Sequence, residues 1–385
     1  MAKTTKILIL SVFILIALRL IFVFFVIPNL ASLEQFKHND YFSMAINGDD
    51  TGYYELAEMV YKFDFKMHEW TFGYPIVMSL FIFIFGEGFY NIAFPVVFSN
   101  GVLLFSVSMA LVVGLSFLIF RKILPAIISG VSFLLFPFLF YLFRNFGPSF
   151  PTGNWNDFNF FHFNWLTAMS DSFSAFLSCL ILFLFVFSLL KNKGFFYFSL
   201  LGFLSGYAMM VRISNIVIPF TISLVILIYC RDKIKKLFFF TAFALVGFLP
   251  QFIYNFVFFG SPISFGYEGA YDDWVELGFA HGPKFGISNV FHLVSKAVEY
   301  SFWVVPFFVL LVSVLAIGYL GIRKISKPFA LAMILWFLLP VLFYMSFVTG
   351  TSTMRYYMPA VAPGIILGTG AYFWLFGKIK KISQS

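Results

Sequence analysis

The chain has 385 residues, of which 61% are hydrophobic and only 11% are charged, and its formal net charge is +8. Because about a quarter of the residues in a soluble domain are charged, this composition excludes a water-soluble globular protein. It predicts an all-α protein embedded in lipid, where helices satisfy their own backbone hydrogen bonds. The basic residues stand beside apolar runs instead of on a soluble domain, so the sequence predicts no nucleic-acid partner.

The apolar runs predict a polytopic transmembrane bundle of about ten spans, since a helix of about 20 apolar residues crosses a bilayer. The stretch 75–85 is too short to cross and predicts a helix lying in the interface. The stretch 195–230, with Arg212 in its middle, predicts two short helices that form a hairpin turning near Arg212. In chain order, the other predicted spans are 7–27, 90–120, 123–142, 171–190, 237–258, 300–320, 328–348 and 356–376.

Charge predicts the orientation of these spans, because Lys and Arg gather on cytoplasmic loops. Ten spans place every basic cluster and both termini on the cytoplasmic side of the plasma membrane. The clusters are Lys3 with Lys6, Arg121 with Lys122, Lys191 with Lys193, 231–236, 323–327 and 378–381. The same threading predicts one transmembrane domain over 1–385 with extracytoplasmic loops at 28–89, 143–170, 259–299 and 349–355, which hold nearly all the acidic and histidine residues.

The first extracytoplasmic loop contains two adjacent carboxylates, Asp49 and Asp50, between Gly48 and Gly52. The glycines favour a turn, and apolar residues at helical spacing follow it, so an aspartate would begin a short helix. A carboxylate there can take a proton from an incoming hydroxyl or hold a cation. The alternative is an aspartate that only caps the helix in a solvated loop.

Two arginines, Arg212 and Arg355, stand at the extracytoplasmic ends of apolar segments. A guanidinium stays protonated and can bind two phosphate oxygens, although snorkelling to the head groups would also explain these positions. The second loop carries His162 among aromatic, Asn and Asp side chains that suit a sugar face, or that form an interfacial belt. The third loop could hold a divalent metal, but no ligand spacing is recognisable, so the sequence predicts no cofactor.

The order of these features resembles the GT-C superfamily of membrane glycosyltransferases, especially protein mannosyltransferases and aminoarabinose transferases. The motifs that carry the resemblance extend over most of the chain. They are a Gly-Asp followed by Tyr and Ala on a short helix, Tyr74-Pro75, Phe85-Gly86, Asp171-Ser172 at the start of a span, the Gly-rich hairpin from Gly202 to Asn215, and Arg355-Tyr356 with Pro359 and Pro363.

The resemblance implies an inverting transfer of a sugar from a polyprenyl-phosphate donor, with a lipid, glycan or protein as acceptor. It implies a first-loop aspartate as general base, and both Asp49 and Asp50 have a tyrosine four residues later. The expected substrate-binding residues are Tyr53, His162, Asp171, Arg212, Arg355 and Tyr356. The alternative function is a membrane transporter or lipid flippase, which would need charged groups at mid-depth, where the spans carry almost none apart from Arg212.

Overall fold

The computed structural model describes residues 2–27, 49–68, 70–146, 165–264, 304–345 and 357–382. Over these ranges the regular structure is helical and contains no strand, which confirms the all-α prediction. The elements are α1 (Ala2–Ile21), η1 (Phe22–Val26), α3 (Asp49–Lys62), α4 (Gly73–Phe85), α5 (Phe89–Phe98), η3 (Ser99–Leu104), α6 (Phe105–Phe120), α7 (Ile123–Phe146), α9 (Ser170–Leu190), α10 (Phe195–Val211), η4 (Ile213–Ile216), α11 (Val217–Tyr229), α12 (Lys233–Phe259), α15 (Val304–Ile325), α16 (Lys327–Met345) and α17 (Met358–Ile382).

A helix occupies each of the predicted spans, and the chain is an integral membrane protein. The hairpin consists of α10 and α11, which are joined through Arg212 and η4, so the chain turns near Arg212 as predicted. Helix α4 is the predicted short helix after the first loop. The segments long and apolar enough to cross a bilayer within the described ranges are Thr4–Val26, Phe89–Phe120, Ser170–Leu190, Lys233–Phe259, Lys327–Tyr344 and Met358–Gly377.

The longest of these segments, Phe89–Phe120, changes its helical geometry in the middle. Pro95 lies inside α5, and the π-helical turns of η3 follow it. A proline removes one backbone donor, and a π-bulge changes the helical phase, so the two halves can present different faces to the bundle. The π segment carries Asn100 and Gly101, whose polar groups are used below.

The first span contains a charged residue, Arg19, that the sequence prediction did not include. Arg19 of α1 is fully buried, and its guanidinium carbon lies 3.8 Å from the centroid of the Phe105 ring. Its Nε and Nη2 atoms donate to the backbone oxygen of Gly101 at 2.9 and 2.6 Å. The sequence prediction that the spans carry almost no charged groups apart from Arg212 is therefore corrected, because Arg19 is a second charge, held inside the bundle.

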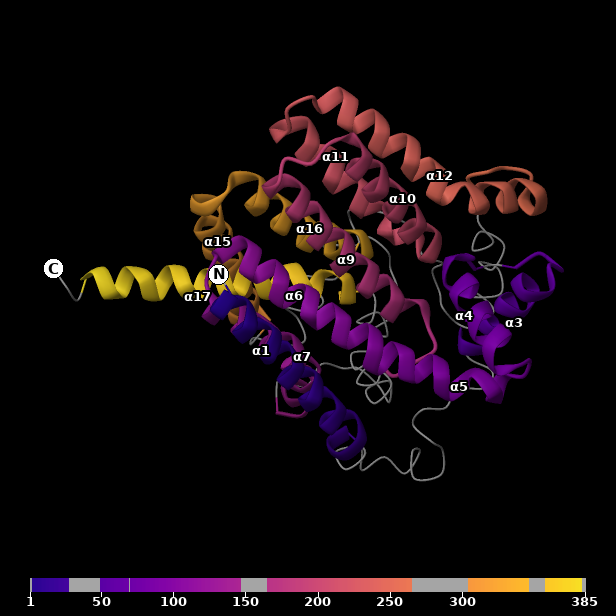
Figure 1. The fold of residues 1–385 in the computed structure, drawn as a ribbon, viewed down its shortest axis with the longest axis horizontal. Helices are drawn as coiled ribbons and strands as arrows, with labels where there is room; N and C mark the ends of the chain where they lie inside the picture. Colours follow the sequence, from indigo (N-terminus) through magenta and orange to yellow (C-terminus); the bar gives the residue numbers. More distant parts are fainter. Residues whose placement is uncertain are drawn as a thin grey trace.

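The hairpin helix α10 packs directly on α12 (Figure 1). Glycines lie at this contact. A Cβ added to Gly206 would lie 2.0 Å from the backbone oxygen of Ala244, and one added to Gly247 would lie 2.3 Å from that of Phe203. Gly202 stands four residues before Gly206, which is the spacing of small residues at close contacts between membrane helices. These glycines let the two backbones touch.

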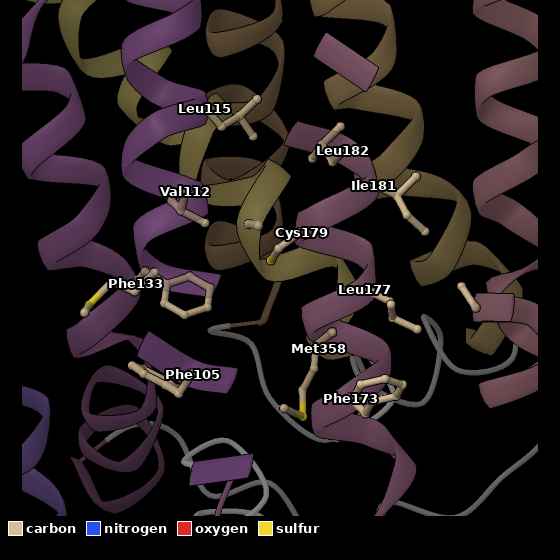
Figure 2. Close-up of a cluster of buried hydrophobic side chains, with 14 of the residues drawn as sticks. Phe105, Val112, Leu115, Phe133, Phe173, Leu177, Cys179, Ile181, Leu182 and Met358 are labelled. Carbon is tan, nitrogen blue, oxygen red and sulfur yellow. The ribbon is translucent and has the colours of Figure 1, made fainter. Parts of the chain in front are cut away.

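An apolar core fills the space between α6, α7, α9 and α17. Figure 2 shows Phe105 and Phe133 facing the α9 side chains, with Met358 at the start of α17 beside them. The same helices separate two polar ends of the bundle. Helix α9 begins at Ser170 beside α3, and it ends at Leu190 near the basic connections, about 30 Å away for a helix of 21 residues.

Candidate active site at the α3–α9 end

The candidate site lies where α3, α4, the start of α9 and the end of α10 meet. In Figure 1, α3 and α4 occupy one end of the bundle, far from the end of α17. We call its polar residues the α3–α9 cluster, which consists of Asp50, Tyr53, Tyr74, Asn100, Ser170, Asp171 and Arg212.

Helix α3 begins with the two aspartates, as predicted, and burial distinguishes them. Asp50 is only 3% exposed, whereas Asp49 is half-buried. Residues three apart lie on one side of a helix, so Asp50 shares the inward face with Tyr53, which is also buried. Tyr53 Oη and Ser170 Oγ share a hydrogen bond of 2.6 Å, which joins α3 to the residue before Asp171. Asp50 is therefore the aspartate turned toward the cluster, at a helix N-terminus that favours negative charge.

Aromatic rings enclose this face of α3. The Tyr53 ring lies 4.6 Å from the Trp70 ring and 5.5 Å from the Tyr74 ring, centroid to centroid. A Cβ on Gly52 would be 2.5 Å from the Trp70 ring, so the glycine also makes room for this indole. The sequence predicted only the turn for Gly52, not this contact.

Tyr74 connects α4 to the π segment of the long helix. Asn100 Nδ2 donates to Tyr74 Oη at 2.7 Å and to the backbone oxygen of Thr167 at 2.7 Å. Burial raises the pKa of Tyr74, the hydrogen bond from Asn100 lowers it, and the nearby Asp50 charge raises it again. Tyr74 thus stays a neutral phenol close to the Asp50 carboxylate.

Asp171 and Arg212 form an ion pair at the other side of the cluster. Asp171 lies in the first turn of α9 and its side chain is 4% exposed, whereas that of Arg212, after the last residue of α10, is 18% exposed. Asn215 fixes the turn that follows, because its Nδ2 donates to the backbone oxygen of Ala208 at 2.7 Å and to Ser174 Oγ at 2.9 Å. Both charged residues were predicted as site residues, but their pairing was not.

The start of α4 is fastened to the end of α10 beside Arg212. Thr71 Oγ1 donates to the backbone oxygen of Val211 at 3.0 Å, and Tyr207 Oη donates to that of Gly73 at 2.7 Å. A Cβ on Gly73 would lie 2.3 Å from the backbone nitrogen of Val211, so only glycine permits this approach. Tyr74 and Arg212 are therefore held on adjoining elements.

Three predicted site residues, His162, Arg355 and Tyr356, lie outside the described residues. The next residue, Tyr357, has its ring centroid 5.9 Å from that of Tyr344, and the Tyr344 hydroxyl hydrogen-bonds Ser214 in η4. The backbone oxygen of Pro359 also accepts a hydrogen bond of 3.3 Å from Ser178 of α9. The start of α17 thus lies against the elements that carry Asp171 and Arg212.

Sequence reasoning missed Tyr74 and Asn100 as members of the site. Asn100 had a usable signal, because an amide inside a long apolar run is costly to bury unless it is hydrogen-bonded. Within the described part of the chain, no group of three or more His, Cys, Asp or Glu side chains could hold a metal ion.

No protein-family model matches the sequence, and no curated protein matches it either. The structure, however, is similar to the crystal structure of the Archaeoglobus fulgidus oligosaccharyltransferase in complex with zinc and sulfate. The TM-score is 0.54 at 15% sequence identity, over 96% of this chain and 49% of the oligosaccharyltransferase. The chain has the fold of a GT-C glycosyltransferase.

The predicted GT-C resemblance is confirmed at the level of the fold. The chain spans about half the length of the archaeal oligosaccharyltransferase. The similarity therefore shows the fold alone, and the α3–α9 cluster is the feature that bears on substrate and chemistry.

Proposed function

We propose that this protein is a membrane glycosyltransferase that moves one sugar from a polyprenyl-phosphate donor to an acceptor hydroxyl on the extracytoplasmic face, with inversion. The acceptor is a lipid, a glycan or a protein. The observation that carries the proposal is a buried carboxylate, Asp50, in one cluster with the Asp171–Arg212 pair at the end of a GT-C fold. A base and a phosphate-binding cation are the two groups that this reaction requires.

In the proposed reaction, the acceptor oxygen attacks the anomeric carbon of the donor and gives its proton to Asp50. The bond from that carbon to the phosphate oxygen breaks, and the electron pair leaves with the phosphate. Arg212 and Arg355 stabilise the leaving group, while Asp171 holds the Arg212 guanidinium in place. Asp50 is preferred to Asp49 as the base because it is buried on the same face of α3 as Tyr53, which is hydrogen-bonded to Ser170 at the start of α9. Tyr53, His162 and Tyr356 are proposed substrate contacts, and no metal cofactor is proposed.

The proposed location of the reaction follows from charge. Arg121, Arg231 and Lys236 gather at the end of the bundle away from the α3–α9 cluster, and basic connections face the cytoplasm. We therefore propose cytoplasmic termini and an extracytoplasmic site, in a single domain over residues 1–385 whose loops are 28–89, 143–170, 259–299 and 349–355. The donor's polyprenyl tail would remain in lipid while its phosphate reaches the rim.

The two adjacent aspartates offer a matched test. Purified protein receives a radiolabelled polyprenyl-phosphate hexose, and membranes from cells lacking the protein supply the acceptor. We expect Asp50→Asn to lower transfer by about 10²–10⁴-fold, the usual contribution of a general base, and Asp49→Asn to retain it. Full transfer by Asp50→Asn, at unchanged melting temperature, would reject Asp50 as the base.

The same preparation tests the alternative of a transporter or flippase. A transporter would need charged groups within the spans, and Arg19 is a buried cation within the first span. It donates to Gly101 and faces Phe105, so its described contacts lie within the packed bundle. In reconstituted vesicles, movement of a fluorescent polyprenyl-phosphate sugar between leaflets, without any sugar transfer, would favour the alternative.

A further inference from the structure

A cavity of about 490 Å³ lies at the opposite end of the bundle from the α3–α9 cluster. It is bounded by the ends of α6, α9, α11 and α15 and by the starts of α10, α12 and α16. We call it the basic cavity. Its lining residues are Leu118, Ile119, Arg121, Ser188, Leu189, Leu190, Asn192, Phe198, Tyr229, Cys230, Arg231, Lys236, Ile325, Ser326, Pro328 and Phe329.

The lining contains three cationic side chains and no carboxylate. Arg121 lies between α6 and α7, whereas Arg231 lies between α11 and α12 and Lys236 in the first turn of α12. The fold therefore brings together cations from two separate parts of the chain. Helix α12 adds to the positive potential, because its first turn, at the positive end of the helix dipole, holds lysines and no acidic residue. Asp232, which precedes the helix, is exposed and does not line the cavity. A cavity with this charge attracts an anion.

Lys236 is the residue that distinguishes this cavity from an ordinary basic loop. Its neighbours Lys233 and Lys235 are exposed, as is usual for lysines at the cytoplasmic end of a span, whereas Lys236 is only 7% exposed. Its Nζ lies 3.3 Å from Asn192 Oδ1 and 5.2 Å from the centroid of the Phe198 ring. Among the residues described, no carboxylate forms a salt bridge with it. Burying an ammonium group is costly unless an anion compensates it, so this position calls for one.

The other walls of the cavity indicate what kind of anion it takes. Leu118, Leu189 and Phe329 form apolar surface beside the cations, and the cavity opens at the end of membrane helices. A free inorganic ion would leave that apolar surface unused, whereas an anionic lipid uses both parts. Basic pockets between membrane helices on the cytoplasmic side are typical sites for lipid phosphates.

We propose that the basic cavity binds the phosphate of an anionic membrane lipid, with Lys236, Arg121 and Arg231 contacting the phosphate and an acyl chain lying on the apolar wall. This site is separate from the proposed donor site and does not depend on the glycosyltransferase proposal.

Lipid retention provides the first test, with Lys235 as the matched control. The protein is reconstituted in nanodiscs of phosphatidylcholine with phosphatidylglycerol, extracted, and examined by native mass spectrometry. We expect Lys236→Gln to retain about tenfold less phosphatidylglycerol, as for a lost charge-assisted hydrogen bond, while Lys235→Gln retains the wild-type amount. Equal retention by Lys236→Gln, or an equal loss in Lys235→Gln, would overturn the proposal. If Lys236→Gln does not fold, Arg231→Gln replaces it, because Arg231 lines the cavity but is exposed.

Cys230 provides a second readout inside the cavity. The chain has two cysteines, and Cys179 is buried in the apolar core, so a maleimide reports on the half-buried Cys230. Phosphatidylglycerol should slow labelling in the wild type but not in Lys236→Gln, and inorganic phosphate at equal ionic strength should have no effect. Equal protection by inorganic phosphate would contradict a lipid ligand, and labelling that neither compound slows would contradict an anion site.

Discussion

The Arg19 guanidinium donates two hydrogen bonds to the backbone carbonyl of Gly101, across 82 positions of sequence. Gly101 lies in the π-helical segment next to Asn100, and Asn100 donates to Tyr74 in the α3–α9 cluster. A charge in the first span thus holds the segment that positions a site residue. Because the guanidinium is planar and presents a fork of donors, no other side chain reproduces both contacts and the stacking on Phe105.

Replacing Arg19 should therefore destabilise the bundle. We expect Arg19→Met to lower the stability by on the order of 1–3 kcal/mol, the cost of losing buried hydrogen bonds to a charged donor. Arg19→Lys should lose less, because an ammonium can still donate to Gly101. The apparent melting temperature of the purified protein in detergent measures both. Leu20→Met, at an exposed neighbour on α1, is the control, and equal stability of Arg19→Met and wild type would contradict the role.

A pair of glycines tests the contact between α10 and α12. Gly206→Ala should destabilise the protein by about 1–3 kcal/mol, because its new Cβ would lie 2.0 Å from the Ala244 oxygen and the helices must separate. Gly368→Ala in α17 meets no atom within 4 Å and should be neutral or stabilising, since alanine favours helix. Melting temperatures compare the two variants. A loss of the same size at both positions would show that helix packing does not account for the effect.

Apolar run length was sufficient to predict the helices of the bundle, and the glycines around Asp49 and Asp50 were sufficient to predict the start of α3. The pairings within the site could not be predicted in this way. Asp171 and Arg212 are 41 positions apart, and Tyr53 and Ser170 are 117 apart, so their contacts depend on which helix faces meet. Apolar periodicity does not decide this in lipid, where every face of a span is apolar.

His68 gives the region around α3 a pH dependence. Its Nδ1 accepts a hydrogen bond of 3.2 Å from the Trp70 backbone N–H, and partial burial lowers the pKa of the imidazole below its ordinary 6.5. Below pH 6.5 the unfolded chain gains a proton at this position before the folded chain does, so stability falls as the pH decreases. Protonation also turns the acceptor into a donor and removes the bond to Trp70, whose ring contacts that of Tyr53.

We therefore expect the melting temperature of the wild type to fall between pH 6.5 and the lowered pKa of His68. His68→Gln cannot titrate and should show a smaller fall over the same interval. Thermal unfolding across a pH series measures the difference between the two proteins. Identical slopes would mean that His68 does not contribute, and a wild type that becomes more stable on acidification would contradict the sign.

The Asp171–Arg212 pair allows a last test, which separates a structural ion pair from a substrate site. Breaking a buried pair by removing one partner costs about 3–5 kcal/mol, whereas removing both leaves no uncompensated charge from the pair. We expect Asp171→Ala and Arg212→Ala each to destabilise the protein, and the double variant to lose less than their sum. Arg212→Lys should keep the charge but lose the planar contact. It should therefore weaken donor binding even if its melting temperature is higher than that of Arg212→Ala. Melting temperatures of the two single variants and the double variant measure the coupling between the residues. The KM for the polyprenyl-phosphate sugar measures donor binding by Arg212→Lys. Additive losses would show that the two residues act independently, and an unchanged KM in Arg212→Lys would restrict Arg212 to holding α10 against α9.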